Sequence, residues 1–307
     1  MVVFDRLPLR FDLKPGMKYV IITPARDEES NITRTIQSVL AQTICPLEWV
    51  IVNDGSGDRT GEILDRYARQ FCWIRPVHRP DRGARKSGAG VMEAFQDGYR
   101  VLRAVDWDFI VKLDGDLSFD PDYFEKCFYH FSREDRLGIG GGMVCRMVDG
   151  RPVDEGTGGP PFHVRGATKI YRRACWDAIG GIVPMTGWDT IDEMKANMLG
   201  WHTYTFREVL LVQHRLTGAA DGSWRSSVKC GRADYNTGYH PLFMLLKCAK
   251  RIFHVPPFID GAGLLWGYFG NCLKRLPRVE DRDLITYVRR QQIRRLLCKP
   301  SLYSGGQ

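Results

Sequence analysis

The first third of this chain alternates between strand-like and helix-like segments, and this alternation limits the folds available to it. Three runs have the β-branched and aromatic character of strands: Lys18 to Thr23, which Pro24 should end, Glu48 to Asn53, and Trp73 to Val77. Apolar residues at helical spacing lie between them: Ile32, Ile36, Val39 and Leu40, then Ile63, Leu64 and Tyr67. This order predicts an α/β fold, with a parallel sheet flanked by helices on both faces.

The next strand-like segment ends in two aspartates separated by one glycine. A helical pattern from Val91 to Leu102 leads into the apolar run from Trp107 to Leu113, which Asp114 and Asp116 follow. In a strand the two carboxylates would share one face, and a glycine at the strand end lets them converge on one cation. Mg²⁺ and Mn²⁺ take oxygen ligands, commonly carboxylates together with substrate phosphates. We expect a divalent-metal site here, with a simple turn cap as the alternative.

Three polar loops follow predicted strands and should meet at one edge of the sheet, where α/β folds bind ligands. They run from Thr23 to Glu29, from Asn53 to Asp58, and from Asp114 to Ser118. Such an edge suits a nucleotide diphosphate held partly through a metal, and Arg82 or Arg85 could contact its phosphates. Neither a P-loop motif nor a strand-linked Gly-x-Gly-x-x-Gly is present, which argues against both of those nucleotide sites.

Four segments, taken together, resemble family 2 glycosyltransferases in order and spacing. They are Val20–Ile32, Ser38–Gln42, Val50–Thr60 and Leu113–Asp116. The resemblance covers roughly the first two-thirds of the chain. It implies a GT-A fold, which is Rossmann-like with a mainly parallel sheet, a nucleotide-sugar donor, Mg²⁺ or Mn²⁺ as cofactor, and inversion at the anomeric carbon.

The resemblance also implies roles for individual residues. Asp54 corresponds to the family's contact on the uridine or guanine side of the donor. Asp114 and Asp116 correspond to its Asp-x-Asp pair, with Asp114 shared between donor and metal and Asp116 favoured as the direct metal ligand. The rest of the base and ribose pocket corresponds to Thr23, Pro24 and Glu28.

A second informative stretch contains the candidate catalytic base. A helical stripe that Gly200 should end places Asp189 at the helix start, where an N-cap role is the structural alternative. Inverting transfer needs a base to take the proton of the acceptor hydroxyl. By resemblance, Asp189 stands where the family carries such an aspartate, although Asp192 and Glu193 form a competing pair. Trp188 replaces an acid often found there, and is either a sugar-stacking or a core residue.

The end of the predicted catalytic region offers two more candidates. His214 and Arg215 follow two expected strands. His214 could complete the metal or diphosphate site, and Arg215 could neutralise the leaving phosphates. A histidine with an ordinary polar role is the alternative for His214.

The positive charge of the chain is concentrated in its last part. The net charge is +8, and residues 221 to 307 hold 15 lysines and arginines against 6 acidic residues. We expect a catalytic domain over 1–220, with a nucleotide-sugar-binding half (18–118) and an acceptor half (119–220), and a helical, basic appendage over 221–307. An anionic partner is indicated, and a membrane surface or phosphorylated substrate fits better than nucleic acid, for which no motif is present.

The tail has features of a membrane-surface region. The apolar segment from Phe258 to Arg275 is broken by glycines and falls short of the ~20 residues needed to span a bilayer. It could lie in the interface, with Trp266, Tyr268 and Phe269 at headgroup depth, or pack on the catalytic domain. The start of the chain shows no signal peptide, and nine scattered cysteines without a Cys-x-x-Cys pair argue for a reducing compartment.

These observations lead to one principal hypothesis. We expect an inverting, metal-dependent hexosyltransferase that acts in the cytoplasm, at the inner face of a membrane, in polysaccharide or glycolipid biosynthesis. Its partners would be a nucleotide sugar, a glycan or glycolipid acceptor and, through the tail, the membrane surface. The alternatives are a sugar nucleotidyltransferase and a non-catalytic, membrane-associated subunit of a polysaccharide assembly complex.

Overall fold

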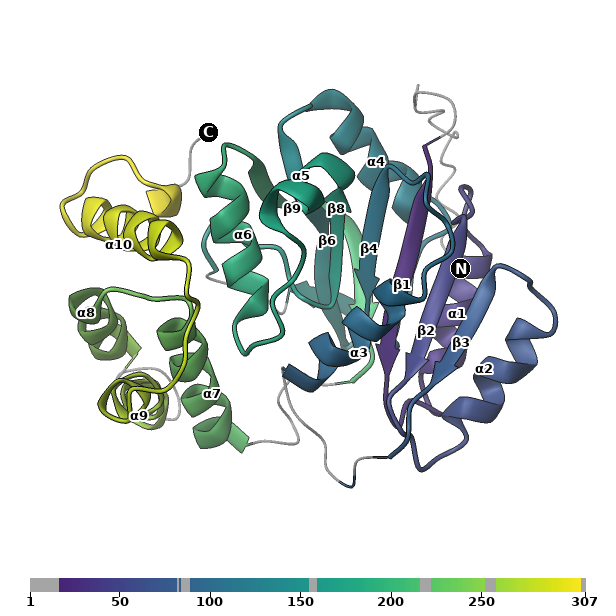
Figure 1. Cartoon of the computed structure of the whole chain (residues 1–307), viewed down its shortest axis with the longest axis horizontal. Helices are drawn as coiled ribbons and strands as arrows, with labels where there is room; N and C mark the ends of the chain where they lie inside the picture. The colour runs from purple at the N-terminus through teal and green to yellow at the C-terminus, as the bar shows by residue number, and fades with distance from the viewer. Residues whose placement is uncertain are drawn as a thin grey trace.

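A computed structural model describes residues 17–81, 83, 89–154, 159–215, 222–251 and 258–304. Within these residues, nine strands form one sheet in the order β3-β2-β1-β4-β8-β6-β9-β5, with β7 paired to β6 (Figure 1). The strands are β1 (Tyr19–Ala25), β2 (Glu48–Asn53), β3 (Ile74–His78), β4 (Phe109–Leu113), β5 (Leu117–Phe119), β6 (Leu137–Val148), β7 (Arg151–Asp154), β8 (Thr168–Arg172) and β9 (His202–Gln213).

The half of the sheet built from β3, β2, β1 and β4 is parallel, as predicted. Ile21 of β1 lies between Trp49 of β2 and Val111 of β4. Pro24 does not end β1, which continues to Ala25. Pairing with β4 stops at Ile22, so Pro24 pairs only with β2, and a residue without an N–H is tolerated where one side of the strand is unpaired.

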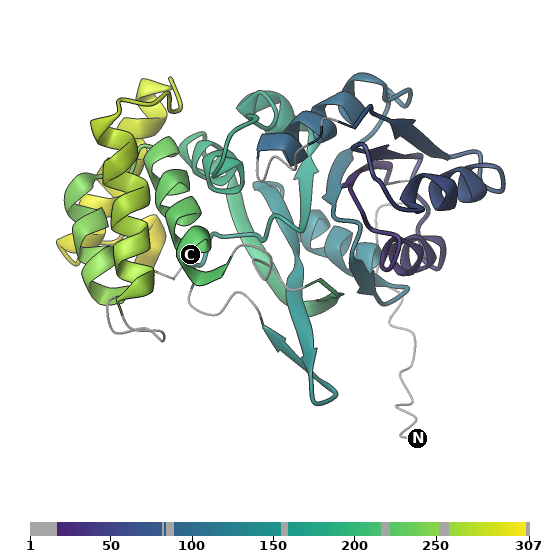
Figure 2. The ribbon, with the colours of Figure 1, turned by 90° about the horizontal axis from the view of Figure 1, so that it is seen from below.

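The other half of the sheet is mixed. β8 runs antiparallel to both β4 and β6, whereas β6 and β9 run parallel to each other. β7 pairs antiparallel with the end of β6, and the two strands form a hairpin (Figure 2). Asp149 and Gly150, both with positive φ, make the turn, because two-residue hairpin turns favour Asp-Gly.

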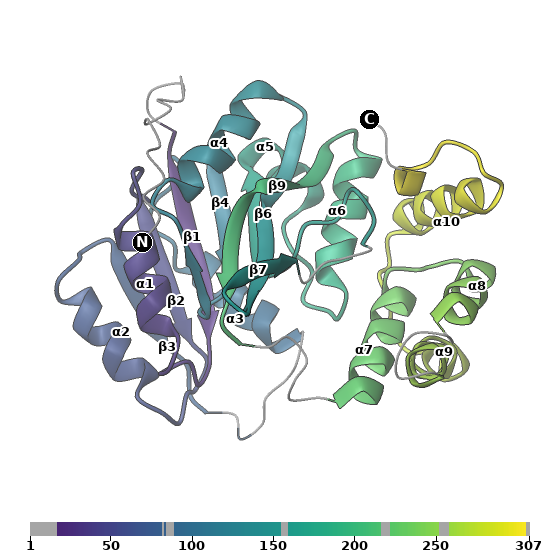
Figure 3. The ribbon, with the colours of Figure 1, turned by 180° about the vertical axis from the view of Figure 1, so that it is seen from behind.

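Helices cover both faces of the sheet because alternate strand residues are apolar on both sides. One face packs against α1 (Ile32–Leu40), α2 (Thr60–Ala68) and α4 (Tyr123–Arg133) through a core that contains Ile21 and Trp49 (Figure 3). The opposite face, which contains Ile22 and Val50, packs against α3 (Ala89–Arg100), α5 (Arg173–Ile179) and α6 (Trp188–Met198). The predicted α/β class, with helices on both faces of the sheet, is confirmed.

The last part of the described chain is helical, as predicted. Its apolar core includes Leu264, Tyr268 and Val288, and it continues into α6 through Ile191 and Met194. No described helix has both the length and the apolar character required to cross a membrane. The helices are α7 (Gly222–Asn236), α8 (Pro241–Arg251), α9 (Ile259–Leu273), α10 (Arg282–Leu296) and the short 3₁₀ turn η1 (Leu302–Ser304).

Candidate active site

The Asp-Gly-Asp segment forms the tight connection between β4 and β5 at the carboxyl edge of the parallel strands. Asp114 donates its backbone N–H to the carbonyl of Ala167, which ties this connection to the start of β8. A Cβ at Gly115 would lie 3.0 Å from Ile32 of α1. Glycine therefore lets α1 pack closely beneath the two aspartates.

Asp116 is a buried carboxylate, and only one of its two oxygens accepts a hydrogen bond within the described residues. Its side chain is 5% exposed, and Oδ2 accepts a hydrogen bond from Nε2 of Gln213 at 3.1 Å. Its buried Oδ1 has no hydrogen-bond partner among the described residues. Burial, and then the neighbouring Asp114, raise the pKa of Asp116 to about 6. A bound divalent cation would satisfy this oxygen and favour its charged form, so the residues present fit such an ion.

Asp114 is more accessible and is paired with a lysine from its own strand. Nζ of Lys112 contacts Oδ1 of Asp114 and also the carbonyl of Gly166. Lys112 is buried, with Nζ 5.4 Å from the centre of the Trp188 ring. A lysine inside an otherwise apolar strand is the sequence signal that could have predicted this contact.

Glu28 brings the loop after β1 to the aspartates. Burial raises its pKa to about 7, against the opposing effect of Arg215, and Asp116 and Asp114 raise it further. Nη1 of Arg215 lies 2.8 Å from Oε1 of Glu28. The structure therefore brings Arg215, Glu28 and the two aspartates into one electrostatic cluster.

His214 lies beside this cluster but turns its ring toward Ser118. Its backbone N–H donates to the carbonyl of Asp116 at 2.9 Å, while Nε2 lies 2.8 Å from Oγ of Ser118. Burial and the nearby Arg34 lower the pKa of His214, which keeps the imidazole neutral. Across the described residues, no three or more His, Cys, Asp or Glu side chains are grouped as a ready metal site.

Asp54 lies at the end of β2 and pairs with an arginine that was not among the residues predicted from the sequence. Nη1 of Arg79 lies 2.8 Å from Oδ1 of Asp54, and Arg79 follows β3 directly. Nη1 of Arg26 donates to the carbonyl of Asp54 at 3.0 Å. Arg82 and Arg85, the two predicted phosphate contacts, lie outside the described residues.

The loop after β1 connects Asp54 with the aspartates. Gly57 donates to the carboxylate of Asp27, and Glu28 donates its backbone N–H to Oγ1 of Thr60. Thr23 is fully buried and accepts a hydrogen bond from the indole of Trp49, so it presents no exposed atom to a ligand. Pro24 is half-buried at the same edge.

Asp189 lies in the first turn of α6 and is not its N-cap. Gly187, with φ of 92°, holds the N-cap position. An oxygen of Asp189 is 3.5 Å from the point where a Cβ on Gly166 would lie. The carbonyl of Gly166 is bound by Lys112, which also contacts Asp114. Asp189 therefore lies near the Asp-Gly-Asp connection.

The competing acids, Asp192 and Glu193, are enclosed. Both are buried, and Lys169 lies 2.9 Å from Asp192 and 2.7 Å from Glu193. Burial raises the pKa of Asp192 to about 6, and Tyr171 donates a hydrogen bond to it. Glu193 also accepts the backbone N–H of Val164. Both acids therefore hold β8 against α6 and offer no accessible oxygen to an acceptor.

Trp188 is a core residue in this structure. It is buried, and the ammonium groups of Lys112 and Lys169 lie 5.4 Å and 5.3 Å from its ring centre. The ring thus packs against two buried lysines, of which Lys112 pairs with Asp114 and Lys169 with Asp192 and Glu193. The core interpretation, one of the two considered from the sequence, agrees with this burial.

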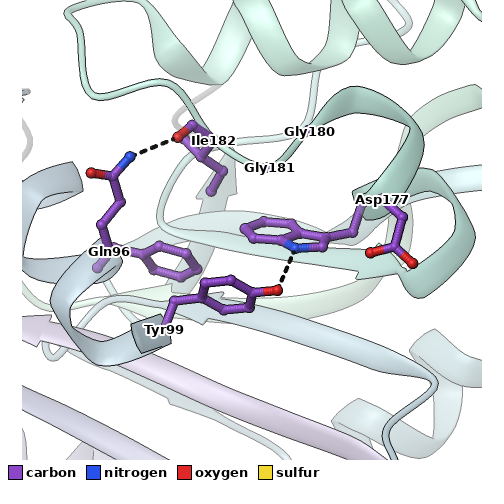
Figure 4. A pocket seen from close by; sticks show the side chains of 8 residues that line it. Gln96, Tyr99, Asp177, Gly180, Gly181 and Ile182 are labelled. Atoms are coloured by element: carbon purple, nitrogen blue, oxygen red, sulfur yellow. Dashed lines mark hydrogen bonds between the residues drawn. The ribbon is translucent and has the colours of Figure 1, made fainter. Parts of the chain in front are cut away.

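A cavity of about 330 Å³ between α3 and α5 lies apart from these residues (Figure 4). The indole of Trp176 donates to Oη of Tyr99 at 3.2 Å, and Gln96 donates to the carbonyl of Ile182 at 3.2 Å. None of the predicted site residues lines it. The candidate active site is therefore at the carboxyl edge of the sheet and not in this cavity.

Comparison with known proteins gives the family and the fold. The family model described as "Glycosyl transferase family 2" matches residues 20–185. A segment of 85 residues is 39% identical to the "Uncharacterized glycosyltransferase EpsJ" of Bacillus subtilis (strain 168), covering 25% of each chain. A segment of 118 residues is 33% identical to the "Chondroitin synthase" of Pasteurella multocida (strain Pm70), covering 38% of this chain and 11% of the relative. The matches thus span a quarter or less of these relatives.

Solved structures show the same fold. The mannosyltransferase PcManGT from Pyrobaculum calidifontis, in complex with GDP-Man and Mn²⁺, aligns with a TM-score of 0.55 at 16% identity, covering 98% of this chain and 80% of that one. S. aureus TarS 1-349, in complex with UDP-GlcNAc, aligns with a TM-score of 0.51 at 16% identity, covering 91% and 81% of the two chains. At this identity the likeness concerns the fold.

Proposed function

Because this chain belongs to glycosyl transferase family 2, we propose that it is a metal-dependent, inverting glycosyltransferase that uses a nucleotide-sugar donor and a glycan or glycolipid acceptor. Glycosyl transfer is the activity of the family. The donor nucleotide, the metal, the stereochemistry and the acceptor are our additions. The observation that supports the metal is the buried oxygen of Asp116, which has no hydrogen-bond partner among the described residues.

The donor would lie along the carboxyl edge of the parallel strands. Asp54, with Arg79 fixing its carboxylate, would contact the base. Pro24 and Glu28 would complete the nucleoside pocket, with Thr23 buried in the strand that leads into it. Asp116 and Asp114 would hold Mg²⁺ or Mn²⁺, with His214 beside them. Such an ion stabilises negative charge on a leaving diphosphate. Arg215, 2.8 Å from Glu28, supplies positive charge at the same edge.

Asp189 would act as the base. Its carboxylate takes the proton of the acceptor hydroxyl as that oxygen forms a bond to the anomeric carbon. The bond from the anomeric carbon to the diphosphate breaks, and its electron pair leaves with the nucleoside diphosphate. Attack from the face opposite the leaving group inverts the configuration. The enclosure of Asp192 and Glu193 by Lys169 supports Asp189 over these two alternatives.

The donor site is tested by calorimetric titration of UDP-GlcNAc and GDP-mannose with and without Mn²⁺. We expect Asp116→Asn to abolish the Mn²⁺-dependent part of donor binding, because a neutral amide is a much weaker ligand for a hard cation. Asp122→Asn is a matched control, since Asp122 also has one buried oxygen without a hydrogen-bond partner but forms a salt bridge with Lys126 at the start of α4. Equal Mn²⁺ dependence in both variants would contradict the assignment.

The same preparation separates the other functions considered from the sequence. A sugar nucleotidyltransferase would release pyrophosphate from a nucleoside triphosphate, whereas this chain should slowly hydrolyse a nucleotide sugar to the nucleoside diphosphate. A non-catalytic subunit would do neither. The match to the glycosyltransferase family supports the second of these three outcomes.

We also propose different roles for three segments of the chain. Residues 1–220 would form the catalytic domain, with 18–118 binding the donor and 119–220 facing the acceptor, and residues 221–307 would contact a membrane surface on its cytoplasmic side. The outer faces of α8 and α9 support this, because they expose leucines and Trp266. Trp266, Tyr268 and Phe269 were all expected at headgroup depth. However, Tyr268 is buried and Phe269 packs against the helical core, so of these three aromatics only Trp266 is available to lipid.

A further inference from the structure

A second cavity, of about 310 Å³, lies between α7 and α9 and combines aromatic with basic side chains. Trp224 and Trp266 are 46% and 65% exposed, respectively, which is high for tryptophan. The lining of this cavity contains no acidic residue and consists of Thr186, Trp224, Arg225, Val228, Lys229, Arg232 and Trp266.

The cations lie along one face of α7. Arg225, Lys229 and Arg232 are spaced four and three residues apart, so their side chains neighbour one another on the helix. Arg225 and Arg232 are exposed, and neither forms a salt bridge with any described residue. Two guanidinium groups without an acidic partner among the described residues provide the bidentate donors that suit a phosphate.

This cavity adjoins the proposed base. Asn236 of α7 donates to the carbonyl of Thr186 at 2.9 Å, and Thr186 is three residues before Asp189. A Cβ on Gly187 would lie 2.9 Å from the carbonyl oxygen of Ala233, so α7 packs directly against the start of α6. Thr186 also lines the cavity. A molecule held between α7 and α9 would therefore contact a residue that is three positions before Asp189 in the sequence.

We propose that this cavity, which we call the α7–α9 subsite, binds a phosphate or diphosphate attached to a sugar of the acceptor. The inference rests on the proposed function and specifies its acceptor class. Arg225 and Arg232 would bind the phosphate oxygens, and the indoles of Trp224 and Trp266 would contact the sugar. A phosphate monoester carries nearly two negative charges, which matches this basic cluster better than the single charge of a sugar carboxylate.

The test uses the full chain in EDTA, which removes the metal-dependent donor site from the measurement. Glucose 1-phosphate and glucose are titrated by calorimetry, and saturation-transfer NMR identifies the contacts of the sugar ring. We expect glucose 1-phosphate to bind more tightly than glucose, and Arg225→Gln or Arg232→Gln to weaken its binding about tenfold, as for loss of a charged hydrogen bond. Trp266→Ala should remove the contacts to the ring. Arg290→Gln is the control, because Arg290 is an exposed arginine of α10 outside the subsite.

Vesicles separate the two sources of this phosphate. Phosphatidylcholine vesicles carrying a polyprenyl-diphosphate-linked N-acetylglucosamine should bind the wild type better than plain vesicles if the acceptor is lipid-linked, and Arg232→Gln should remove that difference. If binding depends on Arg225 and Arg232 only for soluble glucose 1-phosphate, the acceptor is a soluble sugar phosphate. Both results support the subsite.

Three results would overturn the proposal. They are equal affinity for glucose and glucose 1-phosphate, an equal loss in Arg290→Gln, and capture by phosphatidylglycerol vesicles without any binding of a sugar phosphate. Hydrolysis of the nucleotide sugar with Mn²⁺ is measured in parallel. If hydrolysis fails while glucose 1-phosphate still requires Arg225 and Arg232, the proposed function fails and the subsite stands. If hydrolysis is intact and no sugar phosphate binds, the subsite fails and the proposed function stands.

Discussion

The three acidic side chains of α6 differ in whether they can take a proton from a substrate, because their partners differ. Asp192 and Glu193 are enclosed with Lys169, which lies within 3 Å of each. Asp189, on the preceding turn, is half-buried, and no described side chain donates a hydrogen bond to its carboxylate. Removing a proton from a substrate requires an accessible oxygen. At the residue scale, accessibility and pairing therefore select Asp189.

Asp189→Asn should lower transfer to an acceptor by about a thousandfold, the usual contribution of a general base. Donor binding should change little, since Asp189 would act on the acceptor hydroxyl. Transfer is measured as nucleoside diphosphate released in the presence of acceptor, and donor binding by calorimetry. Unchanged turnover would remove Asp189 from the mechanism, and a parallel loss of donor affinity would assign it to the donor site.

Asp116 should make stability depend on pH when no divalent metal is present. Its pKa of about 6 in the folded protein exceeds the ordinary value of 3.8, so the folded state binds more protons than the unfolded chain between these values. The stabilisation of the folded state by protonated Asp116 is therefore present in full below about pH 4 and is lost as pH rises through about 6. The loss should be on the order of 3 kcal/mol.

Urea unfolding of the wild type and Asp116→Asn in EDTA measures this effect. The stability of the wild type relative to the variant should fall as pH rises from about 4 to about 7. Excess Mn²⁺ should reverse the trend, because a metal ion binds the deprotonated carboxylate. A difference that is constant with pH, with and without Mn²⁺, would contradict the titration of Asp116.

At the element scale, the C-terminal helices depend on close contact between α7 and α9. Glycines on both helices remove the side chains that would keep the backbones apart. A Cβ on Gly231 would lie 2.2 Å from the carbonyl oxygen of Leu264, and one on Gly267 would lie 2.1 Å from that of Val228. This contact holds Trp266 beside the basic face of α7, so it also shapes the α7–α9 subsite.

Gly267→Ala should destabilise the protein by about 2 kcal/mol, as expected when atoms are forced into a packed interface. Gly270→Ala is the matched control on the same helix, because a Cβ there meets no atom within 4 Å. The control should stabilise α9 by about 0.5–1 kcal/mol through helix propensity. Thermal unfolding distinguishes the two. Equal effects would show that α9 does not pack closely on α7.

At the scale of the whole molecule, exposed apolar residues are concentrated on the outside of the C-terminal helices. α8 exposes Leu242, Leu245 and Leu246, and α9 exposes Leu265, Trp266 and Leu273. The surplus of basic residues in the sequence also lies after residue 220. Apolar side chains flanked by cations are typical of a surface that lies in a membrane interface.

Leu245→Glu combined with Leu246→Glu should therefore weaken binding to phosphatidylglycerol-containing vesicles at least about tenfold, since each buried leucine contributes about 1.5–3 kcal/mol. Val105→Glu is the control, because Val105 is exposed on the connection that precedes β4. Vesicle sedimentation measures the change. Equal binding of all three proteins would show that α8 does not contact lipid.

Most elements of the fold were predictable because their signals are local. β2 has the predicted bounds from Glu48 to Asn53, and α2 contains the predicted helical stripe of Ile63, Leu64 and Tyr67. The signals failed where pairing between distant segments decides the structure. β7 forms because β6 offers it an edge, and β5 forms because its three residues pair with β9. Neither segment is long enough to show a pattern of its own.

By itself, the sequence determined the alternation of strands and helices, the placement of the polar loops after strands, and the family resemblance, because each depends on spacing along the chain. The tertiary structure alone decided which carboxylates remain available. Arg79 pairs with Asp54, and Lys169 pairs with both Asp192 and Glu193. These contacts join different strands, helices and loops, and a buried charge requires whichever partner the fold brings near. Spacing along the chain carries no information about that partner.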